Sequence, residues 1–128
     1  MKEMVNSATG PVALDDLGII LPHEHLLFAR DERLPFLKQE LIDYKNAGGS
    51  VIIDMSTPEI CKSFERDERI DTLYDLAQET GVTLMYGTGF YKEPRLPEFI
   101  KDKTIDELAE MMIHEIEVGR GKRKIKAS

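Results

Sequence analysis

Residues 17–27 read LGIILPHEHLL and place two of the chain's three histidines, His23 and His25, directly after an apolar run. On a β-strand, successive side chains point to opposite faces, so residues two positions apart share one face. If the strand continues through Pro22, both imidazoles point the same way and Glu24 points the other way. Two converging imidazoles can hold a metal ion, and they can equally be polar residues where a strand reaches the surface.

Outward from this stretch, strand-like and helix-like segments alternate along the chain. Short runs of apolar and β-branched residues predict strands at 17–21, 51–54 and 82–87. Apolar residues spaced three and four positions apart predict helices at 35–47, 67–80 and 104–118. This order predicts an α/β fold of βαβ units around a parallel sheet. A fourth strand would be expected to begin at 125–128.

The last two predicted helices each have a stripe of apolar side chains that we expect to be buried. In the 67–80 helix the stripe is Ile70, Leu73, Leu76 and Ala77, and in the 104–118 helix it is Ile105, Leu108, Met112 and Ile116. Thr104 with Glu107 three residues later is a capping box, which predicts that the helix begins at Thr104. His114 lies off the stripe, so we expect a partly exposed helix residue and not a ligand.

The composition is typical of one globular domain. The 128 residues include 41% hydrophobic and 32% charged residues, enough for a buried core. No apolar run approaches the ~20 residues of a membrane-spanning helix, and the start has no apolar core of a signal peptide. The single cysteine, Cys61, excludes an internal disulfide framework and favours a reducing compartment. We therefore predict a cytoplasmic protein without a membrane partner.

The net charge of −7 conceals an uneven distribution. Five of the 17 basic residues lie in 119–128, and the rest of the chain carries 12 basic against 24 acidic residues. An acidic body argues against a nucleic-acid partner. The basic segment is either a patch for an anionic partner or a solvated connection between two elements, and we favour the connection.

Polar clusters follow all three predicted strands, where parallel sheets bind their ligands. The clusters are His23-Glu24-His25, Asp54 with Ser56 and Thr57, and the segment 87–91. Asp54 has a second interpretation, which we favour, as an acceptor for backbone N–H groups of the following turn. Tyr91 is either loop core or the wall of a pocket. Ser56, Ser63 and Cys61 lack the flanking pattern of a catalytic nucleophile, so we exclude nucleophilic catalysis by them.

Four motifs together resemble the phosphotriesterase-like branch of the amidohydrolase superfamily. They are GPVALDDLGIILPHEHLL, VIIDMST, ETGVTLMYGTGFY and TIDELAEMMIHEIEVG, in the family's order from Gly10 onward. The resemblance implies a (β/α)₈ TIM barrel with two divalent metals, usually zinc, at its C-terminal mouth. Residues 1–128 would then be the three N-terminal βα units of a single barrel domain, most similar to lactonase-like members of the branch.

The resemblance also implies which residues form the site. His23 and His25 match the metal ligands of the family's first strand, and Tyr91 matches an aromatic residue placed against the substrate. A metal-bridging hydroxide would attack a small-molecule ester, lactone or phosphotriester. The bridging lysine or glutamate, the later histidines and the aspartate of the family have no counterparts up to Ser128. We therefore expect part of a zinc-dependent hydrolase, inactive as an isolated chain of 128 residues.

Two alternatives stay open at this point. A non-catalytic truncated product could act through self-association or by pairing with a partner, because three parallel strands leave sheet edges open. A homo-oligomer is the form that self-association would take. The second alternative is a doubly wound nucleotide-binding module, which would show the same alternation of strands and helices.

Overall fold

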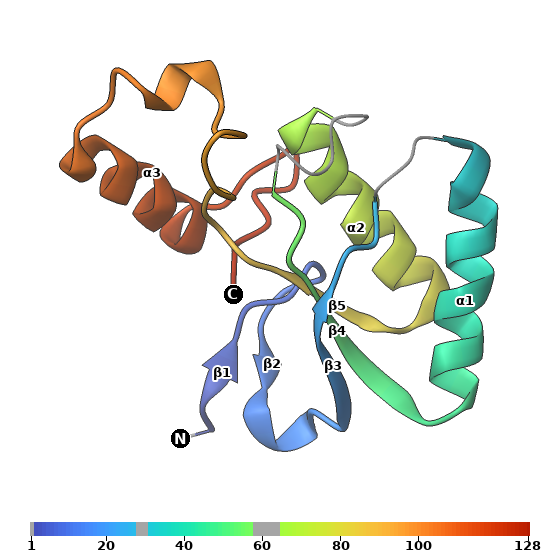
Figure 1. Ribbon diagram of the computed structural model, residues 1–128. Coiled ribbons are helices and arrows are strands. Elements are labelled where there is room, and N and C mark those ends of the chain that lie inside the picture. Colours follow the sequence, from blue (N-terminus) through green and yellow to red (C-terminus); the bar gives the residue numbers. More distant parts are fainter. Residues whose placement is uncertain (1, 28–30, 58–64) are drawn as a thin grey trace.

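A three-stranded parallel sheet, with a helix following each strand, forms the centre of the molecule (Figure 1). The computed structural model describes residues 2–27, 31–57 and 65–128. The sheet has the order β3 (Ile19–Glu24), β4 (Gly49–Asp54) and β5 (Thr83–Tyr86). The helices are α1 (Leu34–Asn46), α2 (Arg66–Thr80) and α3 (Ile105–Glu117). Short 3₁₀ turns cover Leu14–Asp16, Asp31–Arg33 and Glu98–Ile100. The predicted α/β fold with three βα units is confirmed.

Helices α1 and α2 lie side by side on one face of the sheet and enclose the core (Figure 1). The buried stripe of α2 is the predicted one, comprising Ile70, Leu73, Leu76 and Ala77. These side chains share one cluster with Leu41 of α1, Ile52 of β4 and Leu84 of β5. The helical period of the apolar residues therefore predicted this layer correctly.

Tyr44, near the C-terminal end of α1, joins β3 and β4 near the points where they begin. Its hydroxyl lies 2.9 Å from the carbonyl oxygen of Ile19 and 3.0 Å from that of Val51. The ring lies so close to the start of β4 that a Cβ atom at Gly49 would overlap it. The glycine is thus required by the close approach of a side chain to the backbone.

A short hairpin, which the sequence pattern did not predict, precedes the sheet. Strands β1 (Met4–Val5) and β2 (Val12–Ala13) pair antiparallel. The hairpin loop reaches the open edge of β5, where the backbone N–H of Ala8 donates to the carbonyl of Leu84 at 2.7 Å. Farther along this edge the N–H of Ser128 donates to the carbonyl of Tyr86 at 3.0 Å. This contact is consistent with a fourth strand beginning at 125–128.

Helix α3 begins as predicted, but only part of its predicted apolar stripe is covered: Leu108 and Met112 are half-buried, and the buried residue of the helix is Glu115. Thr104 Oγ1 accepts the N–H of Glu107 at 3.2 Å, and the N–H of Thr104 donates to Glu107 Oε2 at 2.7 Å. The prediction that Ile105 and Ile116 are buried is wrong, because they are 84% and 43% exposed. Figure 1 shows α3 to the side of the layer that α1 and α2 form, and it meets the start of α2 through the ion pair of Glu115 with Arg66 at 2.6 Å. His114 is exposed, as predicted.

The basic segment 119–128 packs onto the acidic face of α2. Arg120 pairs with Asp67 at 2.8 Å, and Arg123 pairs with Asp75 at 3.2 Å. The guanidinium of Arg123 also lies 4.3 Å from the ring centre of Tyr74. These contacts pair the two arginines of the segment with carboxylates of α2. Within the described ranges, none of the helices combines the length and apolar composition that crossing a bilayer requires.

Replacing Thr104 with alanine should destabilise the first turn of α3 by about 1 kcal/mol, because the N–H of Glu107 loses its acceptor. Hydrogen exchange of the α3 backbone amides measures this change. The matched control is Thr72→Ala in the middle of α2, whose hydroxyl bonds back to the carbonyl of Glu68. Equal exchange in the two variants would contradict the capping role.

Candidate metal centre

Strand β3 ends between two histidines whose rings meet edge to face. The ring centres of His23 and His25 lie 5.3 Å apart, with an angle of 85° between the ring planes. This confirms the prediction that the two imidazoles share one side of the strand end. Two imidazoles bound to one tetrahedral zinc ion through nitrogens at about 2.1 Å have ring centres roughly 5 Å apart. The separation of the two ring centres is therefore close to that of two imidazoles on one metal ion.

A β-bulge decides which face of the sheet carries these histidines. Leu21 pairs with Ile52 and Glu24 pairs with Asp54, so β3 holds one more residue than β4 between these pairs. Ile52 faces the helices, and Asp54, two residues later, shares that side. Glu24 therefore points toward the helices and His23 points to the opposite face. Without the extra residue, the histidine would follow Leu21 into the helix-covered core.

Beside the histidine pair, the carboxylate of Asp54 is fully buried and uses both oxygens. Oδ1 accepts the N–H of Ser56 at 3.1 Å, its hydroxyl at 2.6 Å and the N–H of Leu26 at 3.3 Å. Oδ2 accepts from the guanidinium of the buried Arg69 at 2.8 Å. This confirms the predicted role of Asp54 as an acceptor for backbone N–H groups. Its engaged oxygens make it unsuited to be a third metal ligand.

Ser56 connects this carboxylate to the histidine pair. Its Oγ lies 3.4 Å from Nδ1 of His25 and 2.6 Å from Oδ1 of Asp54. Metal-binding histidines commonly use their second ring nitrogen in such a contact, which fixes the ring orientation. The environment of His25 is therefore that of an oriented imidazole.

The ligand set is incomplete in the part of the chain that the structure describes. No group of three or more histidine, cysteine, aspartate or glutamate side chains lies there in an arrangement that could hold a metal ion. Catalytic zinc sites typically use three protein ligands and a water. Cys61 and Ser63, excluded above as nucleophiles, lie outside the described residues.

A second buried polar cluster lies at the end of β5, and sequence reasoning missed it. Glu115, a fully buried residue of α3, accepts from Arg66 at 2.6 Å, from Thr88 Oγ1 at 2.6 Å and from Arg120 at 3.4 Å. The guanidinium of Arg66 lies 5.6 Å from the ring centre of Phe90, and burial lowers the pKa of Arg66. The cluster fixes α3 and the loop after β5 to the start of α2.

Tyr91 lies in that same loop and is 42% exposed. The ammonium of Lys92 lies 5.3 Å from the centre of its ring, whereas its neighbour Phe90 packs against Phe99. Tyr91 is thus not part of the loop core. Its predicted contact with a substrate stays a prediction.

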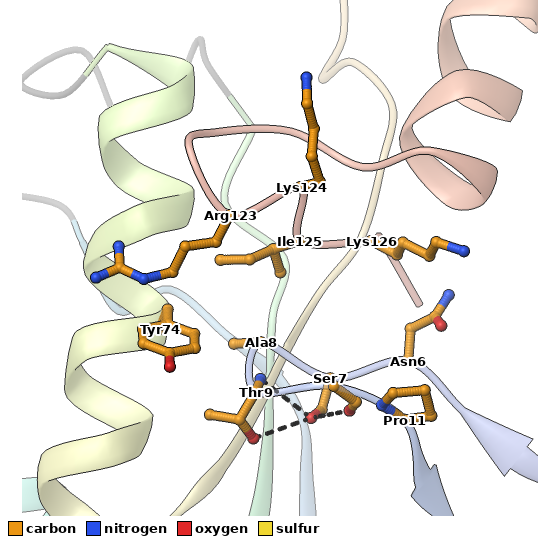
Figure 2. Close-up of a pocket in the computed structure, with 11 residues that line it drawn as sticks. Asn6, Ser7, Ala8, Thr9, Pro11, Tyr74, Arg123, Lys124, Ile125 and Lys126 are labelled. Carbon is orange, nitrogen blue, oxygen red and sulfur yellow. Dashed lines mark hydrogen bonds between the residues drawn. The ribbon is translucent and has the colours of Figure 1, made fainter.

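A cavity of about 360 Å³ lies between the β1–β2 loop, α2 and the segment 123–126. Figure 2 shows that Lys124 and Lys126 direct their side chains away from it, while Arg123 extends toward Tyr74. Its lining includes Ser7 and neighbouring loop residues but neither histidine of the pair. The cavity is therefore separate from the candidate metal centre.

Comparison with known proteins decides the family. The family model described as "Phosphotriesterase family" matches residues 3–128. The chain belongs to the phosphotriesterase family. This confirms the resemblance inferred from the four motifs and favours the barrel over a doubly wound nucleotide-binding module.

Relatives within the phosphotriesterase family include named hydrolases. N-acetyltaurine hydrolase of Danio rerio is 31% identical over 94 residues, which are 73% of this chain and 25% of that protein. Aryldialkylphosphatase of Saccharolobus solfataricus is 28% identical over 117 residues, covering 81% of this chain and 35% of that protein. The chain spans about a quarter to two-fifths of the length of the curated relatives it matches.

A solved phosphotriesterase-family structure gives the same fold. The phosphotriesterase from Mycobacterium tuberculosis aligns with a TM-score of 0.82 and 23% identity, covering 98% of this chain and 43% of that one. The sheet and helices described above therefore correspond to the first three βα units of a TIM barrel, as predicted.

Replacing Arg69 with methionine should lower the free energy of unfolding by about 3–5 kcal/mol, because it leaves the buried carboxylate of Asp54 without its cation. Urea denaturation measures the loss. The matched control is Lys38→Met, which breaks the exposed ion pair with Glu79 and should cost at most about 1 kcal/mol. Similar losses in both variants would show that the Asp54–Arg69 pair has no special structural role.

Proposed function

We propose that His23 and His25 bind a divalent metal ion, zinc in the first instance, at the site of a metal-dependent hydrolase. The observation that carries the proposal is the pair of imidazoles at the C-terminal end of β3, with ring centres 5.3 Å apart. Parallel α/β sheets and barrels bind ligands at this end of their strands. Membership in a family with named hydrolases supports the reaction class.

The residues of this chain have distinct tasks in the proposed site. Bound zinc would supply a Lewis acid and a nucleophilic water at neutral pH. His23 and His25 hold the metal ion as two of its ligands. The cluster around Glu115 holds the loop after β5 in place, and Tyr91 on this loop is exposed and available to contact a substrate.

Ester-type bonds are the proposed substrates, either phosphotriesters or lactones. The presence of an aryldialkylphosphatase among the relatives supports a phosphotriester as the substrate. The proposal of a lactone substrate rests on the resemblance of the four sequence motifs to lactonase-like members of the family. In both substrates, a polarised phosphoryl or carbonyl oxygen is the group on which a Lewis acid acts.

An N-acyl amide is a second candidate substrate. Several relatives are named N-acetyltaurine hydrolase, with identities from 28% to 33%. The same Lewis acid would polarise an amide carbonyl. The proposed metal site alone therefore does not distinguish an ester substrate from an amide substrate. A longer protein that carries this chain, assayed on a phosphotriester, a lactone and N-acetyltaurine, would identify the bond by which of the three it hydrolyses.

Self-association is a further candidate function, favoured by exposed apolar side chains. Ile19 on edge strand β3 is 61% exposed, and Ile105 and Ile113 of α3 are exposed as well. If copies pair through the β3 edge, light scattering should show a mass that rises with protein concentration and falls in Ile19→Lys. A monomer mass at every concentration would exclude this candidate.

The isolated 128-residue chain should bind zinc only weakly, with a dissociation constant above about 1 µM, because two ligands are fewer than the three of a typical catalytic site. It should show no appreciable hydrolysis of a paraoxon-type phosphotriester or a lactone. Calorimetric zinc titration and turnover assays measure both properties.

Three histidine variants provide the controls. His23→Ala and His25→Ala should each abolish the zinc binding, whereas His114→Ala, at an exposed position of α3, should retain it. Zinc binding that survives in the first two variants would refute the proposed metal site. Sub-micromolar affinity with turnover would show that the chain completes the site in another way.

A further inference from the structure

A continuous chain of polar contacts leads from α2 to the imidazole of His25. Arg69 Nη1 lies 2.8 Å from Oδ2 of Asp54, and Oδ1 of Asp54 lies 2.6 Å from Oγ of Ser56. Oγ of Ser56 lies in turn 3.4 Å from Nδ1 of His25. Arg69, Asp54 and Ser56 are all buried, so water competes little for these contacts.

The number of protons available determines which atom donates in each of these contacts. The serine hydroxyl has one proton to donate, and an ionised carboxylate can only accept. The short 2.6 Å contact to Asp54, whose charge is balanced by Arg69, is the geometry of a charge-assisted hydrogen bond. The proton of Ser56 therefore points to Asp54, and the serine oxygen presents a lone pair to His25. The ring nitrogen Nδ1 must then be the donor.

We propose that Ser56 is a positioning residue that holds His25 in the tautomer with its proton on Nδ1. This tautomer leaves Nε2 as the unprotonated nitrogen, the form in which an imidazole binds a metal ion. The inference rests on the proposed function, in which His25 is a metal ligand. Asp54 adds a second restraint, because Oδ1 also accepts the N–H of Leu26, the residue directly after the histidine.

Removal of the serine hydroxyl tests this role in the metal-free protein. Nitrogen-15 NMR at a pH where the imidazoles are neutral should find His25 protonated at Nδ1 in the wild type. In Ser56→Ala the proton should be shared with or moved to Nε2, and Ser56→Thr should restore Nδ1–H. His114, on the exposed side of α3, is the internal control, and its tautomer ratio should be the same in all three proteins.

Zinc titration provides the second readout. Losing a group that orients a metal-binding histidine typically costs 10–100-fold in affinity, and the long 3.4 Å contact points to the lower end, about tenfold, for Ser56→Ala. The matched control is Ser7→Ala, because Ser7 is 3% exposed against 1% for Ser56 and donates to the carbonyl of Gly10, far from the histidine pair. Ser7→Ala should change neither the tautomer nor the affinity.

The two proposals fail in different ways. A wild-type His25 protonated at Nε2, or a tautomer that Ser56→Ala leaves unchanged, would overturn the positioning role whatever the zinc affinity. Zinc binding that is unchanged in both His23→Ala and His25→Ala would overturn the proposed function, while the tautomer measurement would still decide the role of Ser56.

Discussion

The buried carboxylate of Asp54 is the constraint on which the ligand-binding end of the sheet depends. Its side chain joins the end of β3, through the N–H of Leu26, to the turn after β4 and to Arg69 of α2. Its backbone carbonyl accepts the N–H of Gly87 after β5 at 3.3 Å. One residue thus fixes three strand ends and the helix behind them. This carboxylate can be buried because Arg69 balances its charge and both of its oxygens accept hydrogen bonds.

Features that depend on neighbouring residues in the sequence could be predicted, whereas those that depend on distant partners could not. The capping box at Thr104 and the left-handed Gly81 that ends α2 are local, and the apolar stripe of α2 follows the helical period. The predicted burial of the α3 stripe was partly wrong, because the helical period of apolar residues indicates an apolar face but does not show whether another element covers it. The β1–β2 hairpin has strands of only two residues, too short for an alternating pattern to be recognised.

The candidate site divides in the same way. The spacing of His23 and His25 predicted two imidazoles on one side, but the bulge that selects the face is visible only in the pairing of β3 with β4. Arg69 and Glu115 carry charges on helices, where a sequence pattern indicates solvent exposure. Asp54 lies 15 residues from Arg69, and Thr88 lies 27 residues from Glu115, so only the folded chain brings these partners together.

X-ray absorption at the zinc edge of the zinc-loaded protein shows whether the histidine pair holds the metal. We expect nitrogen or oxygen neighbours at about 2.0–2.1 Å with the outer-shell scattering of two imidazoles. This imidazole signal should weaken in His23→Ala and in His25→Ala. Sulfur neighbours at about 2.3 Å, which would place zinc on Cys61, or an imidazole signal unchanged in both variants, would contradict this expectation.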